Sequence, residues 1–359
     1  MSDLKVEVVE SISSVNRNMW NNFVIHNPIL KTTSFFHSYE WLKTIEDGLC
    51  FQAKHIIVRD DKNIKGIFPN FIQKIPKVPF KKMHSLHTGS GGTNYGGPVV
   101  YRKKERRILD LLFKKTSEIC GRDITIMSHS IICFNIDYIR YAKYLIKNEY
   151  RPYFGCTFLF DLTQDEELLK NKMDKRRRRN LQRGLESDHQ IKDIEINDPN
   201  LRNFYRLYRI TILRVKGRLL PFSFFKSMMN NLSEKIKIFS VMVEGREVGE
   251  MLFLLDKKKG YLHYYMNAVD ESDFKYYPNE LINWHVMKWG KANGYRIYGF
   301  GGATASFENS LLQFKEEFGG QILPIIYWNK YFFPWKGSII DILKPIYRTY
   351  LSLASESPR

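Results

Sequence analysis

The chain has 359 residues, and 43% of them are apolar, which is enough for two domains of ordinary size, each with its own hydrophobic core. This apolar content excludes an intrinsically disordered protein. The 56 lysines and arginines outnumber the 38 aspartates and glutamates and give a formal net charge of +18. The surface should therefore attract anions such as nucleic acid, a nucleotide-linked sugar or an anionic membrane.

The cysteines and the N-terminus indicate the compartment. No Cys-x-x-Cys pair and no Cys/His cluster occurs, so the sequence predicts neither a metal site nor a disulfide framework. The opening MSDLKVEVVE has no basic segment followed by an apolar one, and no apolar run approaches the roughly 18 residues that a membrane span needs. We therefore expect a cytoplasmic protein with reduced thiols.

The first half of the chain alternates between helical and strand patterns. Its predicted elements are helices at 15–26 and 38–47, strands at 53–59 and 64–73, a helix at 103–120 and a strand at 123–127. Glycines at 48 and 121 are expected to end the second and third of these helices.

The second half begins with a helix at 164–186, because Thr163-x-x-Glu166 fits a capping box. The elements that follow are helices at 199–215 and 223–232, strands at 237–244, 247–256 and 259–266, a helix at 280–293 and a strand at 295–300. A short helix then runs from Ser310, its expected N-cap, to Gly319.

Two pairs of segments repeat with similar spacing. Residues 55–71 (HIIVRDDKNIKGIFPNF) resemble residues 238–255 (IFSVMVEGREVGEMLFLL), and residues 108–127 resemble residues 280–299. The repeat predicts a tandem duplication of one α/β unit, as domains at 1–155 and 156–330 with a cleft between them.

The tail at 331–359 is aromatic, basic and apolar. This composition fits either a helix packed over a domain or peripheral contact with the inner face of the membrane.

The run KRRRR at 175–179 is the strongest charge signal. A row of every fourth residue contains Leu169, Met173, Arg177, Leu181 and Leu185. Arg177 and its neighbour Arg176 thus interrupt an apolar face, and a buried guanidinium needs an anionic partner. A clamp for a phosphate or carboxylate is one interpretation, and a solvated run of charge is the other.

Lys315 follows Leu311 by one helical turn and precedes Phe318 by three residues, so it lies beside the packed face that Phe314 shares. It is either functional or a surface lysine whose stem covers apolar neighbours. The glycines at 299, 301 and 302 end a strand and allow either close approach of a ligand or a simple turn. One of Tyr264 and Tyr265 is expected to face the cleft.

Four segments occur in an order and spacing that resemble a known family. They are SFFHSYEWLK at 34–43, TFLFDLTQDEELLKNKMDKRRRRNLQRGLE at 157–186, ELINWHVMKWGKANGYRIYGFGG at 280–302 and SLLQFKEEFGG at 310–320. Over roughly residues 5 to 330 the chain resembles the Fem family of peptidyltransferases and its relatives with a BioF2-like acyltransferase domain, in the GNAT superfamily.

The resemblance implies a tandem duplication of two GNAT-like acyl-N-acyltransferase domains packed around a cleft. Better-known members transfer an amino acid from aminoacyl-tRNA to a cell-wall precursor that carries a diphosphate. By resemblance, Lys43 and either Arg177 or Arg178 would hold the diphosphate, and Lys315 would stabilise charge on the reacting carbonyl or the RNA terminus. The candidate catalytic residues are Lys315 and Phe314. The candidate substrate-binding residues are Lys43, Arg176, Arg177, Arg178, Asn180, Tyr264, Tyr265, Gly301 and Gly302.

Two features of the family are missing. The usual pyrophosphate loop is absent after the strand at 259–266, so acetyl-CoA is not expected to bind in the usual mode, and the second half lacks the long helical arm that some members carry. No resident cofactor is expected; acyl-CoA and aminoacyl-tRNA are the candidate co-substrates. No acidic residue is selected as general base by its spacing.

We expect an acyltransferase that moves an aminoacyl or acyl group onto an amine of a phosphate-bearing envelope precursor, with tRNA as a candidate partner. One alternative is an acyl-CoA-dependent N-acyltransferase of a sugar, polyamine or polysaccharide. The other is a non-catalytic basic RNA-binding module.

Overall fold

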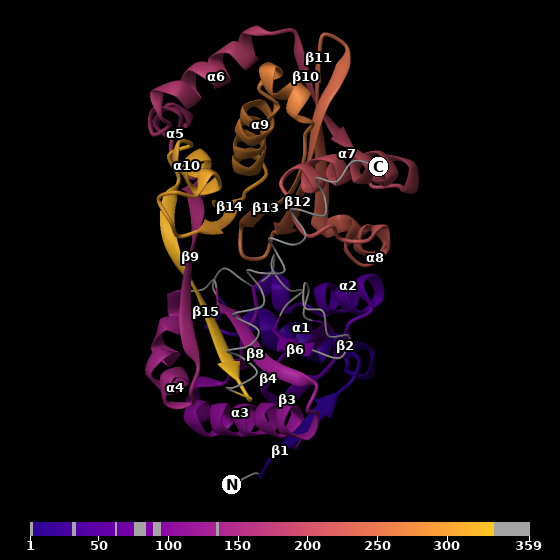
Figure 1. Ribbon diagram of the computed structural model, residues 1–359, viewed down its shortest axis with the longest axis vertical. Coiled ribbons are helices and arrows are strands. Elements are labelled where there is room, and N and C mark those ends of the chain that lie inside the picture. Colours follow the sequence, from indigo (N-terminus) through magenta and orange to yellow (C-terminus); the bar gives the residue numbers. More distant parts are fainter. Residues whose placement is uncertain are drawn as a thin grey trace, which may run out of the picture. The chain divides into compact units, whose positions relative to one another are not determined.

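The computed structural model describes residues 3–30, 34–61, 63–74, 84–88, 95–133 and 136–333, without the side chains of residues 133 and 136–138. These residues form two compact units (Figure 1). The first unit holds the described residues up to Leu42, from Phe51 to Tyr153 and from Ile326 on, and the second holds Lys43–Cys50 and Phe154–Ile325. The predicted tail lies outside the described residues from residue 334 onward.

The first unit contains a small antiparallel sheet covered by a helix. Its helices are α1 (Arg17–His26), the start of α2 (Tyr39–Leu49), α3 (Glu105–Arg122) and α4 (Ala142–Lys147), with 3-10 helices at Ile12–Ser14, Ser34–His37, Arg102–Lys104 and Ile136–Tyr141. Its strands are β1 (Leu4–Val9), β2 (Gln52–Ala53), β3 (His55–Asp60), β4 (Asn63–Phe68), β5 (Phe71–Lys74), β6 (His84–His87), β7 (Val99–Val100), β8 (Ile126–Cys133) and the end of β15 (Gln321–Tyr331).

Strands β1, β3, β4 and β7 pair antiparallel in that order, and the strands β15, β8, β6, β5 and β2 follow one another in a second group. Helix α3 buries residues at every fourth position, among them Ile108 and Leu112. These side chains pack on Ile56, Val58 and Phe68, so the apolar stripe of α3 forms the core of this unit with the sheet.

The second unit carries the longer run of elements. Its helices are α5 (Glu166–Asn171), α6 (Lys175–Glu186), α7 (Asp198–Arg214), α8 (Phe222–Leu232), α9 (Pro278–Ala292) and α10 (Ser310–Glu316), with 3-10 helices at Ser233–Lys235 and Glu271–Tyr276. Its strands are β9 (Arg151–Asp161, from Phe154), β10 (His189–Ile194), β11 (Ile236–Val243), β12 (Arg246–Asp256), β13 (Tyr261–Ala268), β14 (Ile297–Thr304) and the start of β15.

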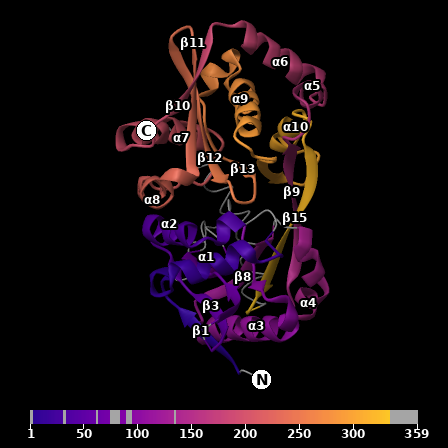
Figure 2. The same cartoon turned by 180° about the vertical axis from the view of Figure 1, so that it is seen from behind.

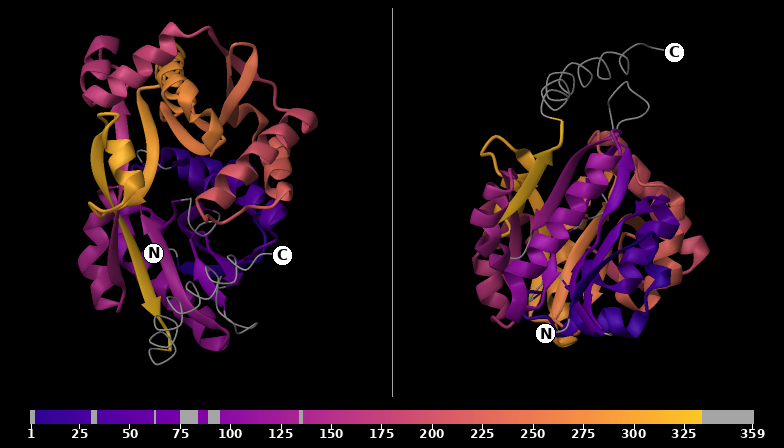
Figure 3. Two further views of the ribbon diagram at one scale, coloured as in Figure 1. Left: turned by 45° about the horizontal axis from the view of Figure 1, so that its top comes forward. Right: turned by 90° about the horizontal axis from the view of Figure 1, so that it is seen from below.

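The sheet of the second unit has the order β10-β11-β12-β13-β14-β9, followed by β15. Helix α9 lies on one face of this sheet and α7 and α8 lie on the other (Figures 1 and 2). Helix α6 packs on α9 (Figure 3), where a Cβ on Gly184 would lie 3.0 Å from the side chain of Leu281. The core under α9 contains Met251, Phe253 and Tyr298.

The repeated segments predicted from the sequence occupy like positions in the two units. In the first, the antiparallel hairpin β3–β4 is followed by α3 and β8; in the second, the hairpin β11–β12 is followed by α9 and β14. The β11–β12 turn has two residues with positive φ, Glu244 at 52° and Gly245 at 75°, which suits the right-handed twist of a hairpin.

Several predicted boundaries were wrong for identifiable reasons. The helix predicted at 164–186 is two helices, because Asp165 and Asp174 each cap a new start. Thr163 makes no capping box; its hydroxyl donates to Asp161. The strand predicted at 64–73 is split into β4 and β5, which are separated by Pro69, a residue without a backbone donor.

The ends of three helices also differ from the prediction. Gly48 and Gly121 lie inside α2 and α3 and do not end them. Asn309, not Ser310, caps α10, and its side chain accepts from the backbone N–H of Leu312. Among the described residues, no helix combines the length and the apolar character that a membrane crossing requires.

A candidate active site around Lys315

The site begins with a break in the sheet of the second unit. Strands β13 and β14 are parallel and pair only from Tyr261–Ile297 to His263–Gly299. On its other side, β14 pairs Gly299 with Leu159 and then Gly302 with Thr157, so one extra residue stands in β14. This is a β-bulge, and Gly301 within it has a φ of +75°. The pairing of β13 with β14 ends where the bulge begins.

Lys315 extends from α10 to the carbonyl groups of this bulge. Its Nζ donates to the carbonyl oxygen of Phe300 at 2.6 Å and to that of Gly302 at 3.2 Å. The Nζ also lies 5.3 Å from the ring centre of Tyr264 on β13 and 5.2 Å from that of Phe300. The lysine is 5% exposed. The bulge thus forms a small polar niche for one amine.

No carboxylate of the described residues forms an ion pair with this amine. Burial lowers the pKa of Lys315 to about 7. Near neutral pH, the site therefore holds both the ammonium and the neutral amine. An ammonium has three N–H donors, and the two carbonyls take two of them. The third can donate to an oxygen of a ligand placed next to the niche.

Gly301 is required by this geometry. A Cβ at residue 301 would lie 3.0 Å from the Nζ of Lys315, and the positive φ strains any side chain. At Gly302 a Cβ would lie 3.0 Å from the carbonyl oxygen of Cys156. Both glycines thus belong to the site because a side chain at either position would crowd its neighbours. The prediction that they contact substrate remains a prediction.

Arg177 finds its anionic partners within the protein. Its side chain is buried, with 5% of the residue exposed. Its Nη1 donates to Glu280 on α9, and its Nη2 donates at 2.5 Å to Glu317, the residue that follows α10. The guanidinium carbon lies 4.4 Å from the ring centre of Phe314. Two carboxylates of the chain therefore stand where the sequence analysis expected a phosphate or carboxylate of the substrate. Binding of a ligand by Arg177 remains a prediction.

The ion pairs of Arg177 fix the position of α10. Asn180, one turn after Arg177 on α6, also donates to Glu280, at 3.2 Å. The backbone N–H of Asp174 donates to the carbonyl oxygen of Glu317 at 2.8 Å. These contacts hold the start of α6 against the end of α10. Since Lys315 lies on α10, they also hold its amine at the bulge.

The remaining predicted residues lie at varied distances from this centre. Phe314 links the two clusters, because its ring packs on Phe300 and against Arg177. Arg176 is exposed, and Arg178 is half-buried with a 3.4 Å contact to Asn171. Their role in substrate binding remains a prediction.

Two further predicted residues are placed as follows. Lys43 lies on α2 and forms an ion pair of 2.5 Å with Asp47, one turn further along. Tyr265 is half-buried on β13 next to Tyr264. Of the two tyrosines, Tyr264 has its ring against Lys315 and Phe300. The expectation that one of them faces a cleft remains a prediction.

Glu280 and Glu317 are structural members of the site that the sequence analysis missed. Both occur inside segments that carried the family resemblance, in ELINWH and FKEEFGG. The available signal was the need of a buried arginine for carboxylates, since two of them satisfy its two terminal nitrogens.

Comparison with known proteins places the site in a family. Residues 170–315 match the model of the GNAT acetyltransferase domain. These residues form a GNAT domain. The match begins just before α6 and ends at Lys315, so it contains both Arg177 and the bulge of β14. The protein is an acyltransferase. No curated protein sequence matches the chain closely enough to count as a relative.

Solved structures share the fold over most of the chain. The structure of FemX has a TM-score of 0.61 at 15% identity and covers 87% of this chain and 96% of its own. A tandem GNAT protein from the clavulanic acid biosynthesis pathway has a TM-score of 0.60 at 8% identity, with 92% and 98% covered. L-PGS from Bacillus licheniformis has a TM-score of 0.58 at 13% identity, with 92% and 96% covered.

These likenesses confirm the predicted fold. A chain covered at 92% by a tandem GNAT protein, with a GNAT domain in its second half, is a tandem duplication of two GNAT-like domains. The predicted resemblance is confirmed as a GNAT domain by the domain match and as a likeness of fold by the structure of FemX.

Proposed function

We propose that the protein transfers an aminoacyl group from aminoacyl-tRNA to an amine of a phosphate-bearing cell-envelope precursor. The observation that carries the proposal is the amine of Lys315, which is buried at the β14 bulge and donates to two backbone carbonyls without a carboxylate partner among the described residues. The fold is similar to that of FemX and of the C-terminal domain of a putative lysylphosphatidylglycerol synthetase, and the lysyl group in the second name supports an aminoacyl donor over others. The net charge of +18 suits two anionic substrates.

The reaction does not require a nucleophilic side chain of the enzyme. The ester of aminoacyl-tRNA is already activated, so the neutral amine of the acceptor attacks the ester carbonyl directly. The carbonyl oxygen becomes an oxyanion in the tetrahedral intermediate. The third N–H of protonated Lys315 donates to this oxyanion in a dry, pre-arranged site, where such a bond is strongest. The C–O bond to the ribose oxygen then breaks, and this oxygen takes up the proton that the attacking amine has lost.

The contacts of Lys315 suit this role. Its two carbonyl partners and the two aromatic rings hold the amine in one place, so no reorganisation is needed when charge develops. The ion pairs of Arg177 with Glu280 and Glu317 make Arg177 a positioning residue for α10.

A second candidate donor is acyl-CoA. It is supported by the family match, because the matched domain is described as an acetyltransferase. With this donor, the same niche would stabilise the oxyanion formed from a thioester.

The donor is tested by label transfer. Purified protein is incubated with a diphosphate-bearing amine precursor and either aminoacyl-tRNA or acyl-CoA, each labelled in the acyl group. The proposal predicts labelled amide product from the tRNA. Product from acyl-CoA alone supports the second candidate. Retention of RNA on the protein without transfer from either donor would indicate the RNA-binding alternative and contradict the proposal.

A further inference from the structure

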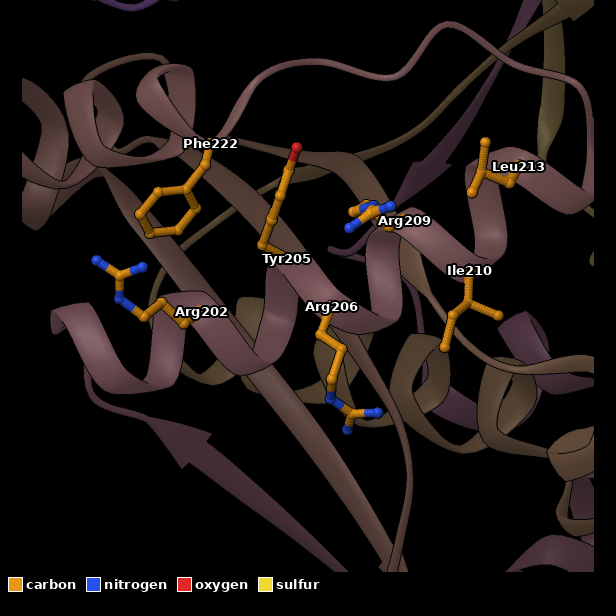
Figure 4. A pocket seen from close by; sticks show the side chains of 7 residues that line it. All are labelled: Arg202, Tyr205, Arg206, Arg209, Ile210, Leu213 and Phe222. Carbon is orange, nitrogen blue, oxygen red and sulfur yellow. The ribbon is translucent and has the colours of Figure 1, made fainter.

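Helix α7 and the start of α8 carry a basic surface far along the chain from the Lys315 niche. Between residues 199 and 233 the sequence has seven basic residues and no acidic one. A cavity of about 430 Å³ opens on these helices, between arginines from successive turns of α7 and the ring of Phe222 (Figure 4). We call this the α7 surface, formed by Arg202, Arg206, Arg209, Ile210, Leu213 and Phe222.

The arginines of the α7 surface differ in how the protein satisfies them. Arg202 pairs with Asp198 at 2.5 Å and lies 4.8 Å from the ring centre of Phe222. Arg206 donates to the side-chain oxygen of Asn203, at 3.2 Å, and its charge also acts on Glu250, which lies beyond ion-pair distance. Within the described part of the chain, neither Arg206 nor Arg209 has a carboxylate at ion-pair distance. Two exposed guanidinium groups are thus left for an external anion.

Large apolar side chains are exposed next to these charges. Leu213 is 59% exposed, Val215 is 55% exposed and Ile210 is 38% exposed. Ile210 and Leu213 follow Arg209 near the end of α7, and Val215 is the C-cap residue, among the further basic residues Arg214 and Lys216. A surface that mixes arginine with exposed aliphatic side chains suits the boundary between lipid headgroups and acyl chains.

The same features argue against nucleic acid. Proteins that bind single-stranded nucleic acid stack its bases on flat aromatic rings. Here, the exposed apolar residues Ile210, Leu213 and Val215 are aliphatic. The rings in this region contact other groups: Phe222 lies against Arg202, Tyr205 packs on Phe222 with the ring centres 5.3 Å apart, and the 37% exposed ring of Phe274 lies 5.0 Å from the guanidinium carbon of Arg214.

We propose that the α7 surface binds a bilayer of anionic phospholipids. Arg206 and Arg209 contact the lipid phosphates, and Ile210 and Leu213 enter the boundary of the acyl chains. This role goes beyond the proposed function, because it needs neither Lys315 nor an acyl donor. It would bring the enzyme to the surface where an amphiphilic acceptor lies.

Vesicle flotation of the full-length protein tests the proposal. Vesicles of phosphatidylcholine with one third phosphatidylglycerol are compared with vesicles of phosphatidylcholine alone. We expect binding to the anionic vesicles only. Since each basic residue near an anionic surface contributes about 1 kcal/mol, the Arg206→Ala/Arg209→Ala variant should bind about 30-fold more weakly. Leu213→Ser, an exposed change that leaves all charges, should also weaken binding, which a purely electrostatic attraction would not show.

The matched control removes two arginines elsewhere. Arg106→Ala/Arg107→Ala changes two exposed arginines of α3 and should keep wild-type binding. Equal loss in this control would reduce the effect to net charge and overturn the proposal. It is also overturned if wild type ignores anionic vesicles, or if the α7 variants lose affinity for an unacylated tRNA while their vesicle binding stays unchanged. Thermal unfolding of each variant checks that it is folded.

Discussion

The buried amine of Lys315 predicts an unusual dependence of stability on pH. The pKa of this lysine falls from 10.5 to about 7 because the folded protein removes its amine from water. Between these two values, the unfolded chain binds a proton that the folded protein does not. The free energy of unfolding therefore rises with pH across this window. Below about pH 7 both states bind the proton, and the contribution of Lys315 no longer changes with pH.

The magnitude follows from the shift. At about 1.4 kcal/mol per pKa unit, burial of this amine costs on the order of 4 kcal/mol at pH 7 and about 2 kcal/mol at pH 9. The Lys315→Met variant removes this cost, but leaves the carbonyls of Phe300 and Gly302 without their donor, which costs on the order of 2 kcal/mol. We expect the variant to be more stable than wild type by about 2 kcal/mol at pH 7 and equal to it near pH 9.

Urea unfolding at pH 6, 7, 8 and 9, followed by tryptophan fluorescence, measures this difference. The control is Lys288→Met, which changes an exposed lysine of α9 and should give a curve parallel to that of wild type. If the difference between wild type and Lys315→Met does not change with pH, the amine is not desolvated and the reasoning fails.

Three further outcomes are expected. Gly319→Ala should destabilise the protein by more than about 2 kcal/mol in urea unfolding, because the φ of residue 319 is +79° and a Cβ there would lie 2.2 Å from the carbonyl oxygen of Lys172. The control Gly245→Ala, with a similar φ and open space around the Cβ, should cost only about 1 kcal/mol. Equal costs for the two variants would refute the close approach at Gly319. Arg177→Met should lower the free energy of unfolding by about 3 to 5 kcal/mol, because Glu280 stays buried without its partner. Adding Glu280→Gln should restore part of this loss. If the double mutant loses as much stability as the two single mutants together, Arg177 and Glu280 do not stabilise each other. For acyl transfer, kcat/KM should stop rising above about pH 7, where Lys315 loses its proton as the acceptor amine gains reactivity; a continued tenfold rise per pH unit to pH 9 would show that the proton is not needed.

Local patterns in the sequence were enough to predict most of the elements. The spacing of Ile282 and Val286 predicted α9, and the paired apolar runs with a charged turn predicted the β11–β12 hairpin. The same reasoning placed Lys315 beside a packed face; its neighbour Phe318 is buried as expected, whereas Leu311, one turn before it, is 48% exposed. Such predictions succeed because 3.6-residue and two-residue periods are set by local geometry.

The parts that failed depend on contacts between distant residues. Glu280 and Glu317 are 103 and 140 residues from Arg177, so no spacing could select them over other acidic residues. The bulge at Gly301 depends on the register of β14 against β9, and two glycines at a strand end are equally compatible with a turn. The split of the helix at Asp174 reflects a cap that competes with helix continuation.

The most direct test of the central claim is the turnover of Lys315→Met with labelled aminoacyl-tRNA and a diphosphate-bearing amine precursor. Loss of one oxyanion donor should lower kcat by about 100- to 1,000-fold, while binding of the donor substrate changes little and the protein remains at least as stable as wild type at pH 7. Lys288→Met should keep wild-type turnover. Turnover of Lys315→Met within a few-fold of wild type would contradict the account, because the amine at the β14 bulge would then take no part in acyl transfer.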